Sequence, residues 1–332
     1  MVMSIVWLVV GLVLILGGAN FLTDGASAVA RRFGVSDLVI GLTVVALGTS
    51  TPELSISILA AIQGNAPLAV GNVVGSNICN ILLIIGMTAL IRPIKIERNI
   101  MNNEIPIVVL SSIIVWVMGN RLLLDGEPNV VTRVEGIFLL IFFLLFMRYT
   151  FASTKIQAKL TLPENSKEDP LQVQAKNRAE GVKMLRSVIY IVGGLAALIW
   201  GGDKFVDGAS DIAKSLGVSE AMIGLTIVAV GTSLPELATS VVAAIKNNPG
   251  LAIGNVIGSN VLNVLLILGA ASVISPLPFQ GVTQVDLGVL VGCSVLFWAF
   301  GWLFGNRVIN RWEGGAMTAA YIAYIVFLVM TA

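Results

Sequence analysis

Ten apolar runs, most of them long enough to cross a lipid bilayer, constrain the fold of this 332-residue chain. A bilayer core is crossed by about 20 apolar residues in helical conformation. Only 12% of the residues are charged, whereas a soluble domain has about 25%. The chain therefore predicts an all-α membrane protein of ten transmembrane helices, near Val6–Thr23, Leu38–Ala61, Leu68–Ile91, Ile105–Met118, Val134–Phe151, Val188–Phe205, Met222–Ile245, Leu251–Ile274, Leu287–Phe304 and Ala316–Met330.

Basic residues predict the orientation of these helices, because cytoplasmic loops carry an excess of lysine and arginine. With the N-terminus outside, only Arg121, Arg133, Lys204 and Lys214 of the 20 lysines and arginines fall on the outer side. The other sixteen fall inside. We therefore expect both termini outside the cell membrane, with the polar segment 153–183 as a cytoplasmic linker.

The chain also repeats itself at an offset of 183 residues. Residues 24–93 align without gaps on residues 207–276, and 40 of these 70 positions are identical. Each copy covers five predicted spans, so the second copy must lie inverted in the membrane. We expect a first repeat at 1–152, with its most similar segment near 36–91, and a second at 184–332, with its segment near 219–274. Inverted repeats with interrupted helices are typical of transporters, whose substrates bind near the membrane midplane.

Two glutamates at equivalent positions, Glu53 and Glu236, fall in the middle of strongly predicted spans. A charge at this depth costs about 2.5–3.5 kcal/mol even on lenient scales, and it persists where it pairs, lines water or binds an ion. No lysine or arginine lies at matching depth. The two carboxylates therefore predict a cation between them.

The neighbouring residues offer only oxygen ligands. Proline follows each GTS sequence and interrupts the helix, which releases backbone carbonyls. The chain contains no histidine, so the set suits a hard cation such as Ca²⁺ rather than a soft metal. Besides the two glutamates, the candidate ligands are Thr49, Ser50, Ser76, Asn80, Thr232, Ser233, Ser259 and Asn263, with the carbonyls of Ala46 and Ala229.

The motifs GTSTPE (48–53) with GSNICN (75–80), and GTSLPE (231–236) with GSNVLN (258–263), resemble those of the calcium/cation antiporter superfamily, close to the prokaryotic sodium/calcium exchangers. The resemblance implies alternating access in a prokaryotic plasma membrane, where a sliding helix pair moves against a core with four ion sites. Ca²⁺ and Na⁺ would be the transported ions, and no cofactor, nucleic acid or protein partner is implied.

The resemblance also implies a role for each ligand. Glu53 and Glu236 would bridge the calcium site together with the carbonyls of Thr49 and Thr232. The four serines and the carbonyls of Ala46 and Ala229 would form two sodium sites, and Asn80 and Asn263 would line the middle site. Two departures stand out: some members have an acid at the position of Asn263, and Thr51 replaces an apolar residue before the proline.

Three other functions remain open from the residues. A proton/calcium antiporter is the nearest alternative, because a glutamate can itself carry protons. Its typical GNxxE-like segment is absent here, since both copies have glycine at that position (GNVVG and GNVIG, 71–75 and 254–258). A passive channel fits the inverted halves less well. An intramembrane enzyme is disfavoured because no nucleophile–base pair is evident.

Overall fold

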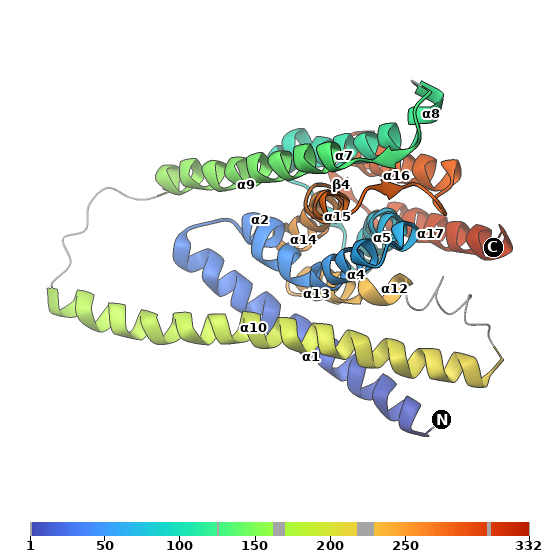
Figure 1. Ribbon diagram of the computed structural model, residues 1–332. Helices are drawn as coiled ribbons and strands as arrows, with labels where there is room; N and C mark the ends of the chain where they lie inside the picture. Colours follow the sequence, from blue (N-terminus) through green and yellow to red (C-terminus); the bar gives the residue numbers. More distant parts are fainter. Residues whose placement is uncertain (1, 125, 162–169, 218–228, 304–306, 332) are drawn as a thin grey trace.

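The computed structural model describes residues 2–124, 126–161, 170–217, 229–303 and 307–331 as an almost entirely helical protein (Figure 1). In chain order its helices are α1 (Val2–Phe33), α2 (Asp37–Ile40), η1 (Gly41–Val45), α3 (Ala46–Thr49), α4 (Thr51–Ile62), α5 (Ala66–Ile78), η2 (Cys79–Ile85), α6 (Gly86–Ile91), η3 (Ile100–Glu104), α7 (Ile105–Met118), α8 (Arg121–Leu124), α9 (Arg133–Thr161), α10 (Pro170–Ser215), α12 (Ala229–Thr232), α13 (Leu234–Ile245), α14 (Pro249–Leu262), η5 (Asn263–Leu268), α15 (Gly269–Ile274), α16 (Gln284–Leu303) and α17 (Arg311–Thr331), with η marking π-helical turns.

Within the described residues, eight continuous helical stretches are long and apolar enough to cross a membrane, and the bent pair on either side of Ser50 makes nine. The predicted span Met222–Ile245 lies partly in residues 218–228, outside the described ranges, and α13 contributes its remaining 12-residue helix. The chain is thus an all-α membrane protein, and the count of ten helices stays a prediction. Helices α9 and α10 continue into the segment 153–183, of which residues 162–169 lie outside the described ranges.

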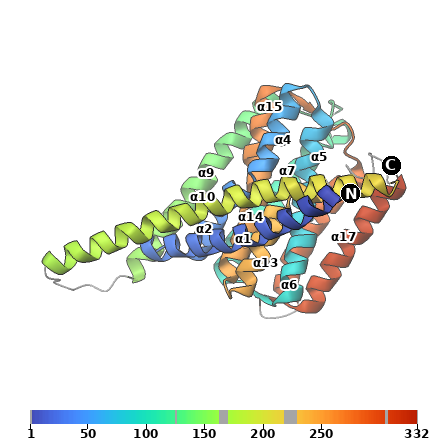
Figure 2. The same ribbon diagram turned by 90° about the horizontal axis from the view of Figure 1, so that it is seen from below.

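The two longest helices, α1 and α10, pack against each other along one side of the bundle (Figures 1 and 2). A Cβ atom at Gly18 would meet the backbone oxygen of Gly194 at 2.7 Å, and one at Gly201 would meet that of Gly11 at 3.0 Å. Contacts that run forward along one helix and backward along the other make the pair antiparallel. Glycine is needed here because any side chain would separate the two backbones.

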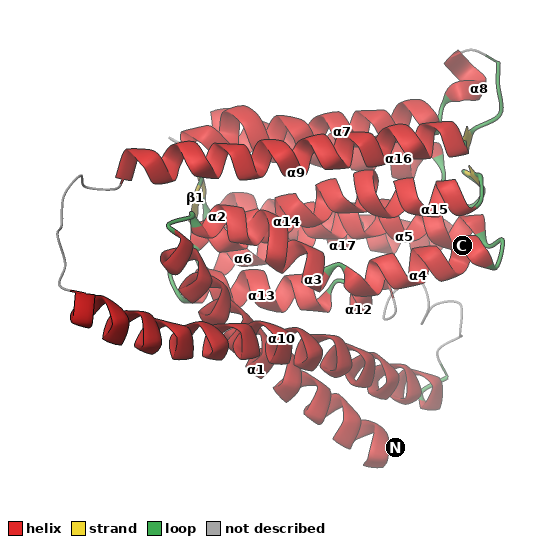
Figure 3. Cartoon of the chain, turned by 60° about the vertical axis from the view of Figure 1, so that its left-hand side comes forward, coloured by secondary structure: helices red, strands yellow, loops and turns green. Residues whose placement is uncertain are grey.

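The remaining helices form the core beside this pair (Figure 3). Helices α5 and α14, with their continuations η2 and η5, lie at its centre and are the most completely buried spans, at 72% and 78%. Helices α7, α9 and α16 cover the side away from α1 and α10. Apolar side chains such as Ile78, Ile81, Val261 and Val264 fill the interior.

Four two-residue strands join loops that are distant in sequence. Strand β1 (Ile94–Lys95) pairs antiparallel with β4 (Val308–Ile309), and β2 (Val130–Val131) pairs with β3 (Leu277–Pro278). The first pair joins two loops predicted on the inner side, and the second joins two loops predicted on the outer side. These pairings agree with the predicted alternation of loops between the two faces of the membrane.

Candidate functional site

Both motif helices are broken at the serine of the GTS sequence. Ser50 lies between α3 and α4 with φ −82° and ψ 10°, and Ser233 lies between α12 and α13 with φ −88° and ψ 5°. The segments flanking Ser50 meet at an angle of 48°. Pro52 and Pro235 lie in the first turn of the new helix, where a missing N–H removes no helical hydrogen bond. The predicted interruption near Pro52 is confirmed, and it lies two residues before the proline.

Each break places one glutamate in the first turn of the helix that follows it, Glu53 in α4 and Glu236 in α13, near the positive end of that helix dipole. Both carboxylates are buried, and Glu53 and Glu236 are each 1% exposed. The Ser50 hydroxyl donates to Glu236 Oε1 at 2.9 Å, and the Ser233 hydroxyl donates to Glu53 Oε1 at 3.4 Å. A serine of each repeat therefore contacts the glutamate of the other, so the two motifs converge on one place.

The central helices add a further polar group, Ser259, to this place. Ser76, Asn80, Ser259 and Asn263 are all at most 3% exposed, and Ser259 Oγ lies 2.9 Å from Ser50 Oγ. Asn80 and Asn263 lie in the π-helical turns η2 and η5. Such turns are frequent at functional sites because they break the regular hydrogen-bond ladder.

Several buried oxygen atoms of the two glutamates and of the two central-helix asparagines have no hydrogen-bond donor among the described residues. They are Glu53 Oε2, Glu236 Oε2, Asn80 Oδ1 and Asn263 Oδ1. A buried acceptor without a partner costs about 1–3 kcal/mol, and a carboxylate costs more. Oxygen ligands that lack donors are what a hard cation such as Ca²⁺ or Na⁺ requires. Within the described ranges no group of three or more acidic, cysteine or histidine side chains is placed to hold a metal ion, so the acidic ligands of the site are the two glutamates.

The remaining candidates flank the helix breaks. The Thr49 hydroxyl lies 3.1 Å from both Val45 O and Asn255 Oδ1, so it links its own helix to α14. The carbonyl of Ala46 accepts the N–H of Ser50 at 2.9 Å. Thr232 is half-buried at the end of α12, and Ala229 begins that helix, although its side chain lies outside the described part. Thr51, an unexplained departure in the sequence, is exposed and donates to Leu47 O at 3.1 Å.

Two asparagines that the sequence analysis did not single out hold the glutamate helices in place. Asn72 Nδ2 donates to Glu53 O at 3.1 Å and to Ser57 Oγ at 2.9 Å. Asn255 Nδ2 makes the equivalent bonds to Glu236 O and Ser240 Oγ, at 3.3 and 3.1 Å. The signal was present, because Asn72 precedes Ser76 and Asn80 at successive intervals of four and so shares their helix face.

A model of the sodium/calcium exchanger proteins matches residues 3–152 and 186–330, which together make up most of the chain. The chain belongs to the sodium/calcium exchanger family. It is a transporter rather than an enzyme, and the family resemblance stated from the motifs is confirmed.

Relatives in this family align over nearly the whole chain. The putative antiporter CaxA of Alkalimonas amylolytica is 37% identical over 98% of both chains. The sodium/calcium exchanger MaX1 of Methanosarcina acetivorans is 34% identical over 97% of both chains. A solved structure of the sodium-calcium exchanger NCX_Mj, soaked with Na⁺ and Ca²⁺, has a TM-score of 0.80 at 34% identity and covers 98% of both chains.

In this member of the family, a cavity of about 390 Å³ leads toward the helix breaks from one end of the α1–α10 pair. It lies between α10 and the two broken helices, and its lining includes Asp207, Pro52, Thr232 and Pro235. Because Thr232 and Pro235 flank Ser233, the cavity reaches the edge of the glutamate cluster.

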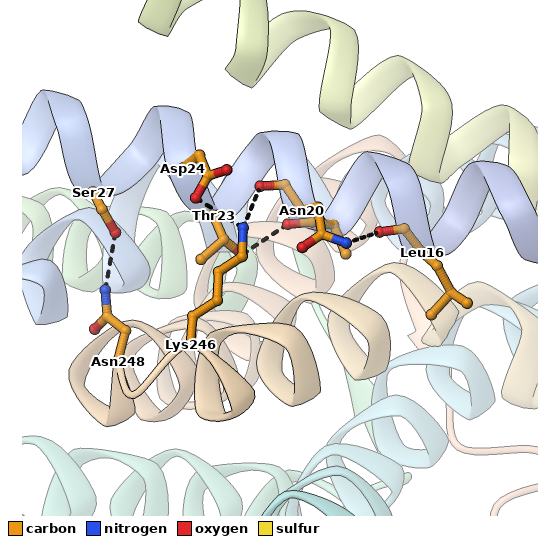
Figure 4. Close-up of polar contacts among 8 residues, drawn as sticks. Leu16, Asn20, Thr23, Asp24, Ser27, Lys246 and Asn248 are labelled. Carbon is orange, nitrogen blue, oxygen red and sulfur yellow. Dashed lines mark hydrogen bonds and ion pairs between the residues drawn. The ribbon is translucent and has the colours of Figure 1, made fainter.

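At the other end of the α1–α10 pair, polar contacts join α1 to the α13–α14 turn (Figure 4). Lys246 Nζ lies 2.8 Å from Asp24 Oδ1 and donates to Asn20 O at 3.1 Å. Asn248 Nδ2 donates to Ser27 Oγ at 2.9 Å. We call these contacts, made by Asn20, Asp24, Ser27, Lys246 and Asn248, the α1 latch.

The repeat supplies an equivalent position for each latch residue at the end of the pair where the first cavity lies. Asp207 corresponds to Asp24, but it pairs with Lys204 of its own helix at 3.0 Å. Gln63 replaces Lys246, and Ser210, which corresponds to Ser27, has a buried hydroxyl without a partner among the described residues. Among the described residues, the two ends of the pair therefore differ in the polar contacts that they make.

Proposed function

We propose that this chain exchanges Na⁺ for Ca²⁺ across a prokaryotic plasma membrane, and that the exchanged ions bind between Glu53 and Glu236. The observation that carries the proposal is the set of buried oxygens without donors in the described part of the chain, contributed equally by the two repeats. Family membership supports sodium and calcium as the ions.

Exchange follows from competition for the same oxygens. One Ca²⁺ neutralises the two carboxylates, and Na⁺ ions placed among the same ligands do so too, so the two cargoes exclude each other. An empty site leaves two unpaired carboxylates inside the membrane, which is costly. The protein therefore changes conformation with cargo bound and returns only with the other cargo, which couples the two fluxes.

We assign the ligands as the family resemblance implies. Glu53 and Glu236, with the carbonyls of Thr49 and Thr232, hold Ca²⁺. The hydroxyls of Ser50, Ser76, Ser233 and Ser259, with the carbonyls of Ala46 and Ala229, hold Na⁺, and Asn80 and Asn263 line the middle of the site.

We also propose that the chain spans the bilayer ten times as two inverted repeats, with both termini outside and the segment 153–183 in the cytoplasm. The antiparallel α1–α10 pair supports the inversion, since the first helices of the two repeats run in opposite directions. The cavity at one end of this pair and the latch at the other support alternating access by movement of α1 and α10.

The test is uptake of radioactive Ca²⁺ into proteoliposomes loaded with Na⁺ and diluted into sodium-free buffer. We expect uptake that stops when the sodium gradient is collapsed. Matched vesicles with only an outward proton or potassium gradient serve as controls. Uptake driven as well by protons as by sodium would overturn the proposal.

A further inference from the structure

A second cavity, of about 520 Å³, lies beside the latched end of the α1–α10 pair. Its lining includes three arginines from two helices: Arg31 and Arg32 from the last turn of α1, and Arg186 from α10. A bias of positive charge toward one side of the membrane accounts for basic residues in loops. It does not account for guanidinium groups from two distant segments around one cavity.

Arg186 is held in place by its own helix. Its Nε and Nη2 atoms donate to the hydroxyl of Tyr190 at 3.0 and 2.6 Å, and its guanidinium lies 5.0 Å from the centre of the Tyr190 ring. Tyr190 in turn packs against Phe21 of α1, with the ring centres 5.1 Å apart. An arginine fixed in this way loses less side-chain freedom when it binds an anion.

The lining of the cavity has a net positive charge. Among the described residues, Asp24 is its one acidic residue, and Lys246 already contacts the Oδ1 atom of that residue at 2.8 Å (Figure 4). Three arginines against one aspartate leave a net charge of two positive units among the lining residues. Arginine forks match the geometry of phosphate oxygens, so a phosphate group is the anion that best fits this set.

The surface beside the cavity is apolar. Leu185, Ile189 and Val192 of α10 are 63%, 57% and 61% exposed, and Phe21 of α1 is 49% exposed. In a membrane these side chains contact acyl chains. Basic pockets between membrane helices bind anionic lipid headgroups. We infer that this cavity binds the phosphate headgroup of an anionic phospholipid whose acyl chains lie along α1 and α10.

The experiment measures thermal unfolding of the purified full-length protein in detergent, with added dioctanoyl phosphatidylglycerol, dioctanoyl phosphatidylcholine or glycerol phosphate. We expect phosphatidylglycerol alone to raise the unfolding temperature, in a saturable way. In the double variant Arg31→Gln/Arg186→Gln, we expect the half-saturating concentration to rise at least about ten-fold, which corresponds to about 1.4 kcal/mol. Because this readout requires no transport, it is independent of the proposed ion exchange.

The matched control is Arg92→Gln/Arg98→Gln, which removes two positive charges from exposed positions outside the cavity. It should keep the wild-type response to phosphatidylglycerol. Arg186→Lys, which keeps the charge but loses the planar fork, should respond more weakly than the wild type. Equal responses of the cavity and control variants would refute the site. A shift with phosphatidylcholine or glycerol phosphate as large as that with phosphatidylglycerol would refute the assignment to an anionic lipid.

Discussion

Replacing either glutamate of the site by glutamine tests the proposed cargo site most directly. Glu53→Gln and Glu236→Gln keep the size of the side chain and one oxygen, and each removes one of two charges that are 1% exposed. Ca²⁺ would then carry an uncompensated positive charge in a buried site. Without an ion, both variants should fold, because the change removes a buried carboxylate whose Oε2 atom has no donor among the described residues.

The expected size of the effect follows from the cost of breaking a buried ionic arrangement, which is about 3–5 kcal/mol. This cost weakens Ca²⁺ binding by about 100-fold to about 4,000-fold. At a Ca²⁺ concentration of about 100 times its dissociation constant, the ion stabilises the wild type by about 2.7 kcal/mol. At the same concentration, a variant with 100-fold weaker binding gains only about 0.4 kcal/mol.

The assay pairs thermal unfolding with and without Ca²⁺ with sodium-driven Ca²⁺ uptake in proteoliposomes. Both glutamine variants should lose uptake and the Ca²⁺-dependent rise in unfolding temperature, while their ion-free unfolding temperature stays equal to or above that of the wild type. Glu104→Gln is the control. Glu104 is also buried in the membrane region, at 4% exposure, and its Oε2 atom has no partner in the described part of the chain.

Two results would refute this reasoning. If Glu53→Gln or Glu236→Gln exchanged Ca²⁺ at a near wild-type rate, the two-carboxylate site would be wrong. If Glu104→Gln lost uptake and Ca²⁺ stabilisation to the same degree, removal of any buried acid would explain the effect, and the cluster at the helix breaks would have no special role.

Three further predictions test other parts of the structure. Lys246→Gln removes a partly exposed ion pair with Asp24 that is worth about 0.2–1 kcal/mol. Spin-label distances between α1 and the α13–α14 turn should therefore show about 1.4-fold to 5-fold more of the form in which the two are separated. An unchanged distance distribution would contradict the latch. A cysteine at Glu127 should react with impermeant thiol reagents in intact cells and one at Arg92 should not, with the reverse pattern contradicting the orientation. Because position 263 is an asparagine, the site has two carboxylates, and exchange should need no potassium. With three Na⁺ exchanged per Ca²⁺, each cycle moves one net charge, so the rate should respond to a voltage set with valinomycin. A potassium requirement, or a rate that does not depend on voltage, would contradict the charge count.

The convergence of the two motifs could be predicted because the repeat is so strong. With 40 of 70 positions identical, any contact made by Ser50 and Glu236 implies a similar one by Ser233 and Glu53, and both are present. The two glutamates could be identified as site residues because a charged side chain inside a membrane span is costly and is usually functional. Most of the spans could be predicted because the length of an apolar run alone identifies them.

Other features depend on packing that one sequence does not reveal. The π-helical turn at Asn263 requires a local change of hydrogen-bond pattern, and the residues of this turn are apolar apart from the asparagine. The hydroxyl of Thr49 seemed a ligand by composition, but its direction depends on the position of Asn255 in another helix. From the sequence, the carbonyls freed at the breaks could be assigned only to the region near each proline. The structure places the break itself at the serine two residues earlier.

The unequal state of the two ends has a physical origin in the positions where the repeats differ. If the two copies were identical, exchanging their conformations would turn the structure open at one end into one open at the other, with the same free energy. Any preference must therefore come from unlike pairs. Asp24 and Asp207 are alike in the two copies, whereas Lys246 and Gln63 are not, and Lys246 pairs with Asp24 of α1 at 2.8 Å. The bias between the two forms of the exchanger is thus expected to depend on substitutions that distinguish the repeats, and Lys246 contacts the moving helix directly.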